Sequence, residues 1–381
     1  TAPVQSVAKA NNSLDQLTQI QTVFGTVNYQ YDSKGNLSVF TDARSNPTTF
    51  TYDPFNRLSS QRDPLGFTES YTYDHNGNRL TLTYKDNTRV QYGYDAGNRL
   101  NRITDALGGI RQMTYDAQGN KLSETDKRNQ ITTFTYDLAN RLTSESNPQR
   151  TATVYTYDAN NNRLSETISN KLILQTAYDR LNRPTLVTHP GGKTESFTYD
   201  ADSNRITRTD GNNQTITLVY DSVNRLTQKR LPEGGAVNYT YDNWDNLLTT
   251  TQDTHNTIQV YDFLNRPIRE EHTFTDLPGQ IKTVIRTYDA NSNLTSLTDA
   301  ASRMFNYGYD QRNLLSTVTS TGNQTFANYT YTPTGRISTL TNGNGIRTAN
   351  TYDRLNRIEV STISSPTNQT LWQQTYTYDQ E

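Results

Sequence analysis

Polar and apolar positions alternate along short segments of this chain. Aromatic side chains stand two residues apart with a threonine between them, as at Phe134, Thr135 and Tyr136, and again at Tyr155, Thr156 and Tyr157. Successive side chains of a β-strand point to opposite faces of its sheet. The pattern therefore predicts strands with aromatic rings on one face and threonine hydroxyls on the other.

A Tyr-Asp pair closes each of these strands and returns at a nearly constant interval. From Tyr31 to Tyr241 each step is 21 residues (52 − 31, 73 − 52 and so on), and from Tyr241 to Tyr378 the steps range from 20 to 27 residues. So regular a period predicts a repeat architecture. Each copy holds two short strands and two turns rich in Asn, Asp and Gly, which predicts one β-hairpin per copy.

The turns that follow the Tyr-Asp pairs alternate. From Tyr to the Asn of the turn there are five residues at Tyr31–Asn36 and four at Tyr52–Asn56, and this alternation continues along the chain. We therefore expect a double repeat of 42 residues, with odd and even turns of different type and Asn in left-handed backbone. The fold class is all-β, one long antiparallel sheet of 21-residue hairpins.

The repeated Tyr and Asp residues are predicted to be structural. Tyr packs its ring while its hydroxyl stays bonded or hydrated, and Asp accepts hydrogen bonds from turn amides. The alternative for the aspartates is an acidic or metal-binding site. The predicted structural set is Tyr52, Asp53, Tyr73, Asp74, Tyr94, Asp95, Tyr115, Asp116, Tyr136, Asp137, Tyr157, Asp158, Tyr199, Asp200, Tyr220 and Asp221. The Arg that follows many of the turns is expected to pair with a repeat carboxylate or to stack on Tyr.

Composition narrows the functional classes. The net charge is −2 and no basic stripe interrupts the repeat, so nucleic acid is not an expected partner. There is no cysteine, and the four histidines show no metal-ligand spacing, so no metal or cofactor is predicted. No apolar run predicts membrane insertion. Nothing breaks the period to build a unique polar cluster, and we expect no enzymatic activity.

The number of strands constrains the shape of the sheet. More than 30 strands about 4.8 Å apart, each rotated by about 20°, cannot stay flat. The sheet is expected to coil into a spiral wall or to wind as a ribbon.

Two regions differ from the regular repeat. Residues 1–21 lack it and are expected to be a lead-in or a cap, while residues 22–381 form the sheet of about 17 repeats. The long steps place additional residues near 273–279 and 364–370, where loops are expected to lengthen. Because Tyr378 to Glu381 stop inside a repeat turn, we expect the chain to be a piece of a longer protein, truncated at its C-terminus.

The motif Tyr-Asp-x-x-(x)-Asn-Arg-Leu resembles the YD repeat of RHS proteins. Its clearest copies are Tyr52–Leu58, Tyr73–Leu80, Tyr94–Leu100, Tyr136–Leu142, Tyr157–Leu164 and Tyr220–Leu226. The resemblance implies a hollow shell of spiralling hairpins. In bacterial RHS proteins and the C components of Tc toxins such a shell encloses a toxic polypeptide, and in the similar teneurins it serves adhesion. The aspartyl self-cleavage core of toxin carriers has no counterpart here, because Asp63-Pro64-Leu65-Gly66 lies in an ordinary repeat turn.

Two functions follow as expectations. The first is a secreted or surface-delivered shell segment, as in polymorphic toxins, whose partners are an enclosed toxin polypeptide or further repeats of the parent chain. The second is an extracellular structural or adhesive stalk or filament, as in wall-associated YD-repeat proteins, that binds cell-surface glycans or neighbouring cells.

Overall fold

The computed structural model describes residues 8–148, 150–169, 171–322 and 324–379. These residues form 35 β-strands of one sheet and a single 3-10 turn, η1 (Pro190–Gly192). The predicted all-β, antiparallel fold is confirmed. The chain divides into two compact units, and we describe each by itself: unit 1 comprises Thr1–Ile110 and Thr283–Glu381, and unit 2 comprises Arg111–Lys282.

Unit 1 contains two stretches of consecutive hairpins. Its strands are β1 (Ala8–Asn11), β2 (Leu17–Thr22), β3 (Gly25–Tyr31), β4 (Leu37–Thr41), β5 (Pro47–Tyr52), β6 (Leu58–Arg62), β7 (Thr68–Tyr73), β8 (Arg79–Thr83), β9 (Arg89–Tyr94), β10 (Leu100–Thr104), β28 (Leu294–Thr298), β29 (Met304–Tyr309), β30 (Leu315–Ser320), β31 (Thr325–Tyr331), β32 (Ile337–Asn342), β33 (Arg347–Tyr352), β34 (Ile358–Ser364) and β35 (Thr370–Thr375). Two further strands include residues of both units: β11 (Ile110–Tyr115) and β27 (Ile281–Tyr288).

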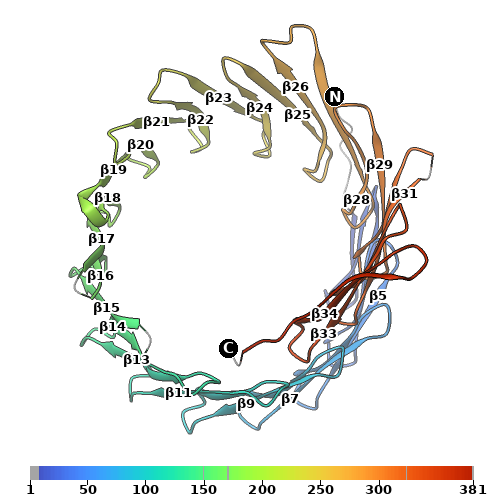
Figure 1. Cartoon of the computed structure of the whole chain (residues 1–381), viewed down its shortest axis with the longest axis horizontal. Coiled ribbons are helices and arrows are strands. Elements are labelled where there is room, and N and C mark those ends of the chain that lie inside the picture. The colour runs from blue at the N-terminus through green and yellow to red at the C-terminus, as the bar shows by residue number, and fades with distance from the viewer. Residues whose placement is uncertain (1–7, 149, 170, 323, 380–381) are drawn as a thin grey trace. The chain divides into compact units, whose positions relative to one another are not determined.

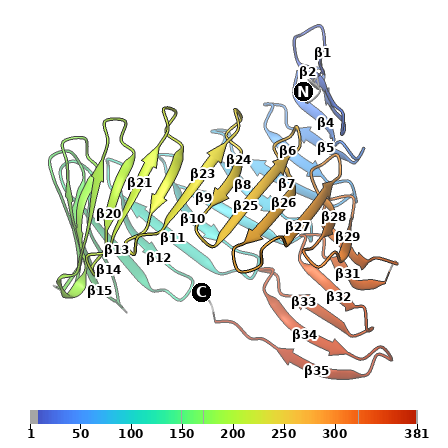
Figure 2. The same ribbon diagram turned by 90° about the horizontal axis from the view of Figure 1, so that it is seen from above.

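Unit 2 is one run of hairpins in chain order (Figure 1). Its strands are β12 (Lys121–Thr125), β13 (Ile131–Tyr136), β14 (Leu142–Asn147), β15 (Arg150–Tyr157), β16 (Arg163–Ile168), β17 (Lys171–Tyr178), β18 (Pro184–Thr188), β19 (Thr194–Tyr199), β20 (Arg205–Thr209), β21 (Thr215–Tyr220), β22 (Leu226–Arg230), β23 (Ala236–Tyr241), β24 (Leu247–Thr251), β25 (His255–Tyr261) and β26 (Pro267–Phe274). Figure 2 shows strands such as β21 and β23 running between turns at both of their ends.

One register recurs from hairpin to hairpin. The residue before the repeat Tyr faces the residue eight positions after that Tyr, as in Thr135↔Ser144 and Thr156↔Ser165. The register then shifts at the Tyr itself, which marks a β-bulge in each hairpin. Bulges increase the local twist of a sheet. The opposed Thr and Ser hydroxyls bond to each other, at 2.6 Å for Thr156 and Ser165, so the predicted hydroxyl face is confirmed.

The odd and even Tyr-Asp turns have the same backbone, and our expectation of two turn types was wrong. At Asp32 and at Asp53 alike, the Asp N–H donates to the C=O four residues on, and its C=O accepts from the N–H three residues on. That third residue has positive φ in both cases, 85° for Gly35 and 61° for Asn56. The Asn residues of the two kinds of turn occupy different positions. In even turns the Asn is the residue with positive φ, whereas in odd turns the Asn comes one residue after it.

The longer steps mostly lengthen strands rather than loops. β26 and β27 each span 8 residues, and β34 spans 7. Near residues 364–370 the chain keeps the ordinary turn, because Ser365 N–H donates to Gln369 C=O. The loop expected there is absent from this described segment. The turn after Tyr331 also keeps its shape without Asp, since Thr332 Oγ1 accepts from Arg336 N–H at 3.1 Å.

The sheet has a thin core. Among the described residues, the buried apolar side chains are those of Leu82, Met113 and Ala327. Most strand side chains are half-buried, as expected for a single layer with both faces partly wet. Residues 8–22 already include β1 and β2; β1 pairs with β2, and β2 pairs with β3. Residues 1–7 lie outside the described part of the chain, so the expected lead-in or cap at residues 1–21 stays a prediction.

Candidate functional site

The repeat tyrosines tie each hairpin to the strand before it. The hydroxyl of Tyr157, at the end of β15, donates a 2.7 Å hydrogen bond to the C=O of Leu142, the first residue of β14. The same bond reaches back 15 residues from Tyr52, Tyr73, Tyr94, Tyr136, Tyr199 and Tyr220. Tyr115 ends β11 at the equivalent strand position.

The repeat aspartates hold their own turns. Asp53 Oδ1 accepts from the N–H of Phe55 at 2.9 Å and from the N–H of Arg57 at 3.0 Å. These are the bonds that a turn-capping aspartate makes. The predicted members that show at least one such Oδ1 bond are Asp53, Asp74, Asp95, Asp116, Asp137, Asp158, Asp200 and Asp221.

In even turns an Arg joins two repeats. Arg141 Nε donates to Asp137 Oδ2 at 2.7 Å, and its Nη1 donates to the C=O of Asp158 in the next odd turn at 2.6 Å. The guanidinium carbon also lies 4.9 Å from the ring centre of Tyr157. Arg57, Arg183 and Arg225 make the same three contacts, so both expected roles of this Arg are confirmed together.

In odd turns an Asn completes the connection. Asn162 Nδ2 donates to Asp158 Oδ2 and to Oδ1 of Asn182 in the following even turn, both at 2.8 Å. Even turns therefore bond forward through Arg and odd turns bond forward through Asn. The double repeat of 42 residues is a hydrogen-bonded ladder along the row of turns, which is the physical reason for its alternation.

These bonds also set the charge state of the aspartates. The Arg141 side chain, followed by its backbone N–H, holds the pKa of Asp137 below its ordinary value. At Asp74 the side chain of Asn78 lowers the pKa first, and burial opposes it. A carboxylate used in this way is a permanent acceptor rather than a poised proton donor. The predicted Tyr-Asp pairs recur, one pair at each of these turns. The structure does not bring them together into one polar site.

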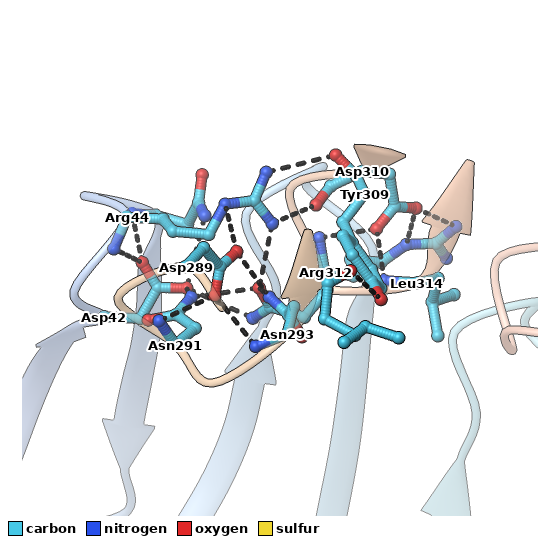
Figure 3. Close-up of polar contacts among 12 residues, drawn as sticks. Asp42, Arg44, Asp289, Asn291, Asn293, Tyr309, Asp310, Arg312 and Leu314 are labelled. Atoms are coloured by element: carbon cyan, nitrogen blue, oxygen red, sulfur yellow. Dashed lines mark hydrogen bonds and ion pairs between the residues drawn. The ribbon is translucent and has the colours of Figure 1, made fainter. Parts of the chain in front are cut away.

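Within unit 1, two distant stretches of the chain meet at their turns (Figure 3). We call this contact the seam: the turn at residues 42–46 lies against the turns at residues 289–293 and 310–314. Arg44 Nη1 donates to Asn313 Oδ1 at 2.9 Å and to the C=O of Asp310 at 3.1 Å, while Arg44 Nη2 donates to the C=O of Tyr309 at 3.1 Å. Its Nε lies 3.5 Å from Asp289 Oδ2.

Asp42 is the other centre of the seam, and it is buried. Its Oδ2 accepts from Asn291 Nδ2 at 2.6 Å and from Asn313 Nδ2 at 3.2 Å, while its Oδ1 accepts from two amides of its own turn. Burial raises the pKa of Asp42, but the hydrogen bonds from Asn46, Asn313 and Asn291 outweigh it, so the pKa lies below its ordinary value.

The backbones at the seam approach closely at Gly25. A Cβ built on Gly25 would lie 2.9 Å from the Cβ of Ala290 and 3.0 Å from the C=O of Ala43. Only glycine fits there without a shift of its neighbours. The sequence separations across the polar contacts, 249 to 271 residues, correspond to about 12 to 13 repeats of 21 residues.

The strand register also brings together two histidines that sequence reasoning did not connect. His255 on β25 and His272 on β26 have ring nitrogens 3.0 Å apart, and their rings stack with centroids separated by 5.2 Å. Their spacing of 17 residues carries no motif. The repeat register could have found them, because it places residue 272 opposite residue 257, two residues from His255.

Two absences apply to the part of the chain that the structure describes. No cluster of three or more His, Asp or Glu side chains is arranged there to hold a metal ion. Residues 8–148, 150–169, 171–322 and 324–379 include no helix with the length and apolar character needed to span a membrane.

A sequence model of one family, described as RHS Repeat, matches eight segments that together cover about two thirds of the chain. These are residues 31–69, 52–89, 73–110, 115–152, 136–170, 178–215, 220–257 and 288–325. No curated protein matches the chain in sequence.

Solved structures share the fold at low identity. The crystal structure of TcdB2-TccC3-Cdc42 has a TM-score of 0.76 at 15% identity, over 99% of this chain and 24% of that chain. The crystal structure of TcdB2-TccC3-TEV has a TM-score of 0.75 at 16% identity, over 99% and 24%. A Photorhabdus luminescens Tc holotoxin pore with a TccC3 variant has a TM-score of 0.50 at 17% identity, over 95% and 26%. The chain therefore spans about a quarter of the chains it matches.

Proposed function

The chain belongs to the RHS repeat family, and from this membership we propose that it is a non-catalytic segment of a shell wall that encloses a toxic or unfolded polypeptide. The seam of unit 1 is the observation that carries the proposal. There, Arg44 and Asp42 join two stretches of the sheet through their turns. A sheet whose distant turns bond to each other can place one row of hairpins beside another row. The resulting wall is taller than one hairpin but remains one sheet thick.

The make-up of the wall supports the same function. Its single layer leaves both faces partly wet, with Thr and Ser hydroxyls on one and aromatic rings on the other. Such faces offer many weak contacts, which suits a container for an unfolded chain. The repeat residues are engaged in turns and ladders, which supports a non-catalytic role. The similarity to a Tc holotoxin pore supports a secreted parent protein.

The absence of cysteine makes the proposal testable by thiol labelling. Ser165 and Glu166 are neighbours on β16, and they pair with Thr156 and Tyr155, so their side chains point to opposite faces. Single variants Ser165→Cys and Glu166→Cys would be labelled with a maleimide. Each would be measured in the chain alone and in the chain carrying an unfolded, cysteine-free polypeptide fused at its C-terminus.

An enclosed polypeptide protects one face only. We expect labelling of one variant to slow by at least about tenfold in the fusion, an effect worth about 1.4 kcal/mol, while the other is unchanged. The same polypeptide added as a separate chain is the control and should have no effect. Equal labelling of both faces with and without the fused polypeptide would contradict enclosure by this segment. It would favour the alternative, an extracellular stalk or filament that binds glycans or neighbouring cells.

A further inference from the structure

The histidine pair of β25 and β26 has the geometry of a small metal chelate. Nε2 of His255 and Nδ1 of His272 face each other at 3.0 Å, and Thr257 Oγ1 lies 3.4 Å from both nitrogens. Both histidines are half-buried, so the pair is sheltered but open to solvent. We propose that His255 and His272 together bind one divalent transition-metal ion, with water in its remaining positions.

Neighbouring side chains prepare these two nitrogens as ligands. Glu270 Oε1 lies 3.2 Å from Nε2 of His272 and can accept a hydrogen bond from it, and with the proton on Nε2 the Nδ1 of that ring keeps its lone pair for an ion. A carboxylate behind a ligating histidine is the usual second support of a metal site. On the other side, Phe274 stacks on His255 with ring centroids 4.6 Å apart and an interplanar angle of 6°, which restricts that ring.

The distance between the nitrogens selects the kind of metal. Two nitrogens 3.0 Å apart, each about 2.0–2.1 Å from one ion, subtend an angle of about 90° at that ion. This is the angle between adjacent ligands of square-planar or octahedral ions, whereas tetrahedral zinc needs a wider angle. Imidazole ligands in such geometries are typical of Cu²⁺ and Ni²⁺. Thr257 can hydrogen-bond to a water on the ion.

The proton balance of binding is simple. Without metal, one N–H bridges Nε2 of His255 and Nδ1 of His272, and with His272 protonated on Nε2 that N–H belongs to His255. When metal binds, neutral His255 carries its proton on Nδ1 instead, so both facing nitrogens donate lone pairs and no proton is released. The ion then replaces a hydrogen bond as the link between β25 and β26.

The site lies at the end of an extended hairpin. β25 and β26 pair from Tyr261 and Pro267 out to His255 and Phe274, a longer ladder than in the regular repeats. A bound ion would fasten the open end of this ladder. Metal binding should therefore stabilise this hairpin by mass action. The inference rests only on the geometry of these side chains and does not depend on the proposed function.

Calorimetric titration of the full chain with NiCl₂ tests the proposal, with thermal unfolding as the second measurement. We expect one saturable site per chain and a Ni²⁺-dependent rise in the unfolding temperature. His255→Gln and His272→Gln should each weaken binding by at least about tenfold, and without metal each should unfold near the wild-type temperature. Glu270→Gln should weaken binding less than either.

His189 provides the matched control, because its Nε2 also lies near a carboxylate, Glu195, at 3.5 Å. His189→Gln should bind Ni²⁺ as the wild type does. If the wild type shows no saturable site, or if His255→Gln and His272→Gln bind Ni²⁺ as the wild type does, the pair is a hydrogen-bonded element of the hairpin and the proposal is wrong.

Discussion

Asn291 donates a 2.6 Å hydrogen bond to the carboxylate of Asp42, although 249 residues separate them in the chain. Aspartates such as Asp53 hold their own turns, but Asp42 holds its own turn and two asparagines of a distant stretch as well. The seam therefore arises from an ordinary turn residue given additional partners. No new kind of residue is needed to join one stretch of the repeat to another.

The first prediction concerns the energy of this seam. Asp42→Ala removes the carboxylate that accepts hydrogen bonds from Asn291 and Asn313. The side-chain amides of these two half-buried residues then lose that acceptor. We expect a loss of about 1–3 kcal/mol beyond that of a lost turn cap. Asp210→Ala is the matched control, because Asp210 caps the same kind of turn with bonds to Asn212 and Gln214 only. Urea unfolding of both variants gives the difference, and equal losses would mean that the seam contributes no stability.

The second prediction concerns the ladder of turns. Arg141→Lys keeps the positive charge but removes the planar group that contacts Asp137, Asp158 and Tyr157 at once. We expect the amides of this turn and the next to exchange their hydrogens about tenfold faster. Arg163→Lys is the control, since Arg163 is more exposed and its contacts, a 3.5 Å ion pair with Glu166 and a guanidinium 5.4 Å from the ring centre of Tyr155, stay within one hairpin. Unchanged exchange in Arg141→Lys would show that the ladder is not an energetic unit.

The third prediction separates the two contributions of a repeat tyrosine. Tyr157→Phe removes only the hydrogen bond to Leu142 C=O and should cost about 0.5–1.5 kcal/mol. Tyr157→Ala also removes the ring and should cost about 2–4 kcal/mol. Both values come from urea unfolding. A variant that loses a specific activity while its stability is unchanged would contradict the structural role of this tyrosine.

The fourth prediction is a loss of stability in acid. The pKa values of repeat aspartates such as Asp74, Asp137 and Asp42 are lower in the folded chain than their ordinary values. A lowered folded pKa gives stability that is present above the unfolded pKa, about 3.9, and is lost as the pH falls through the folded values. Because many copies share this feature, the urea midpoint should be nearly constant from pH 7 to about 5 and should fall steeply below about pH 4. A midpoint that stays constant down to pH 2 would rule out the aspartate ladder as a source of stability.

Much of the fold could be predicted from the sequence because each repeat contains its own strand and turn signals. Alternation at Phe134, Thr135 and Tyr136 predicted the strand and its two faces, and Asp137 predicted the turn. These are local effects between residues a few positions apart. The error about turn types had a local cause too. Gly35 and Asn56 occupy the same left-handed position, and Asn36 lies one residue later in a different role.

The seam and the histidine pair could not be predicted in the same way. Arg44 is a turn residue like any other in the sequence, and its partners at Tyr309 and Asn313 depend on how a distant stretch returns to it. His255 and His272 are 17 residues apart, and only the strand register makes them neighbours. Long-range placement decides the seam, whereas the register of a single hairpin decides the histidine pair.

The most direct test of this account is a disulfide across the seam. The chain has no cysteine, and a Cβ at Gly25 would lie 2.9 Å from the Cβ of Ala290, slightly inside the separation of about 3.5–4.5 Å found in disulfides. The double variant Gly25→Cys with Ala290→Cys should form an intramolecular disulfide under mild oxidation, seen by mass spectrometry of the linked peptides. Gly25→Cys with Ser60→Cys, whose second cysteine lies on β6, three strands from β3 in the same unit, should not. Free thiols in the first variant, or disulfides only between separate chains, would contradict the seam and with it the proposed wall.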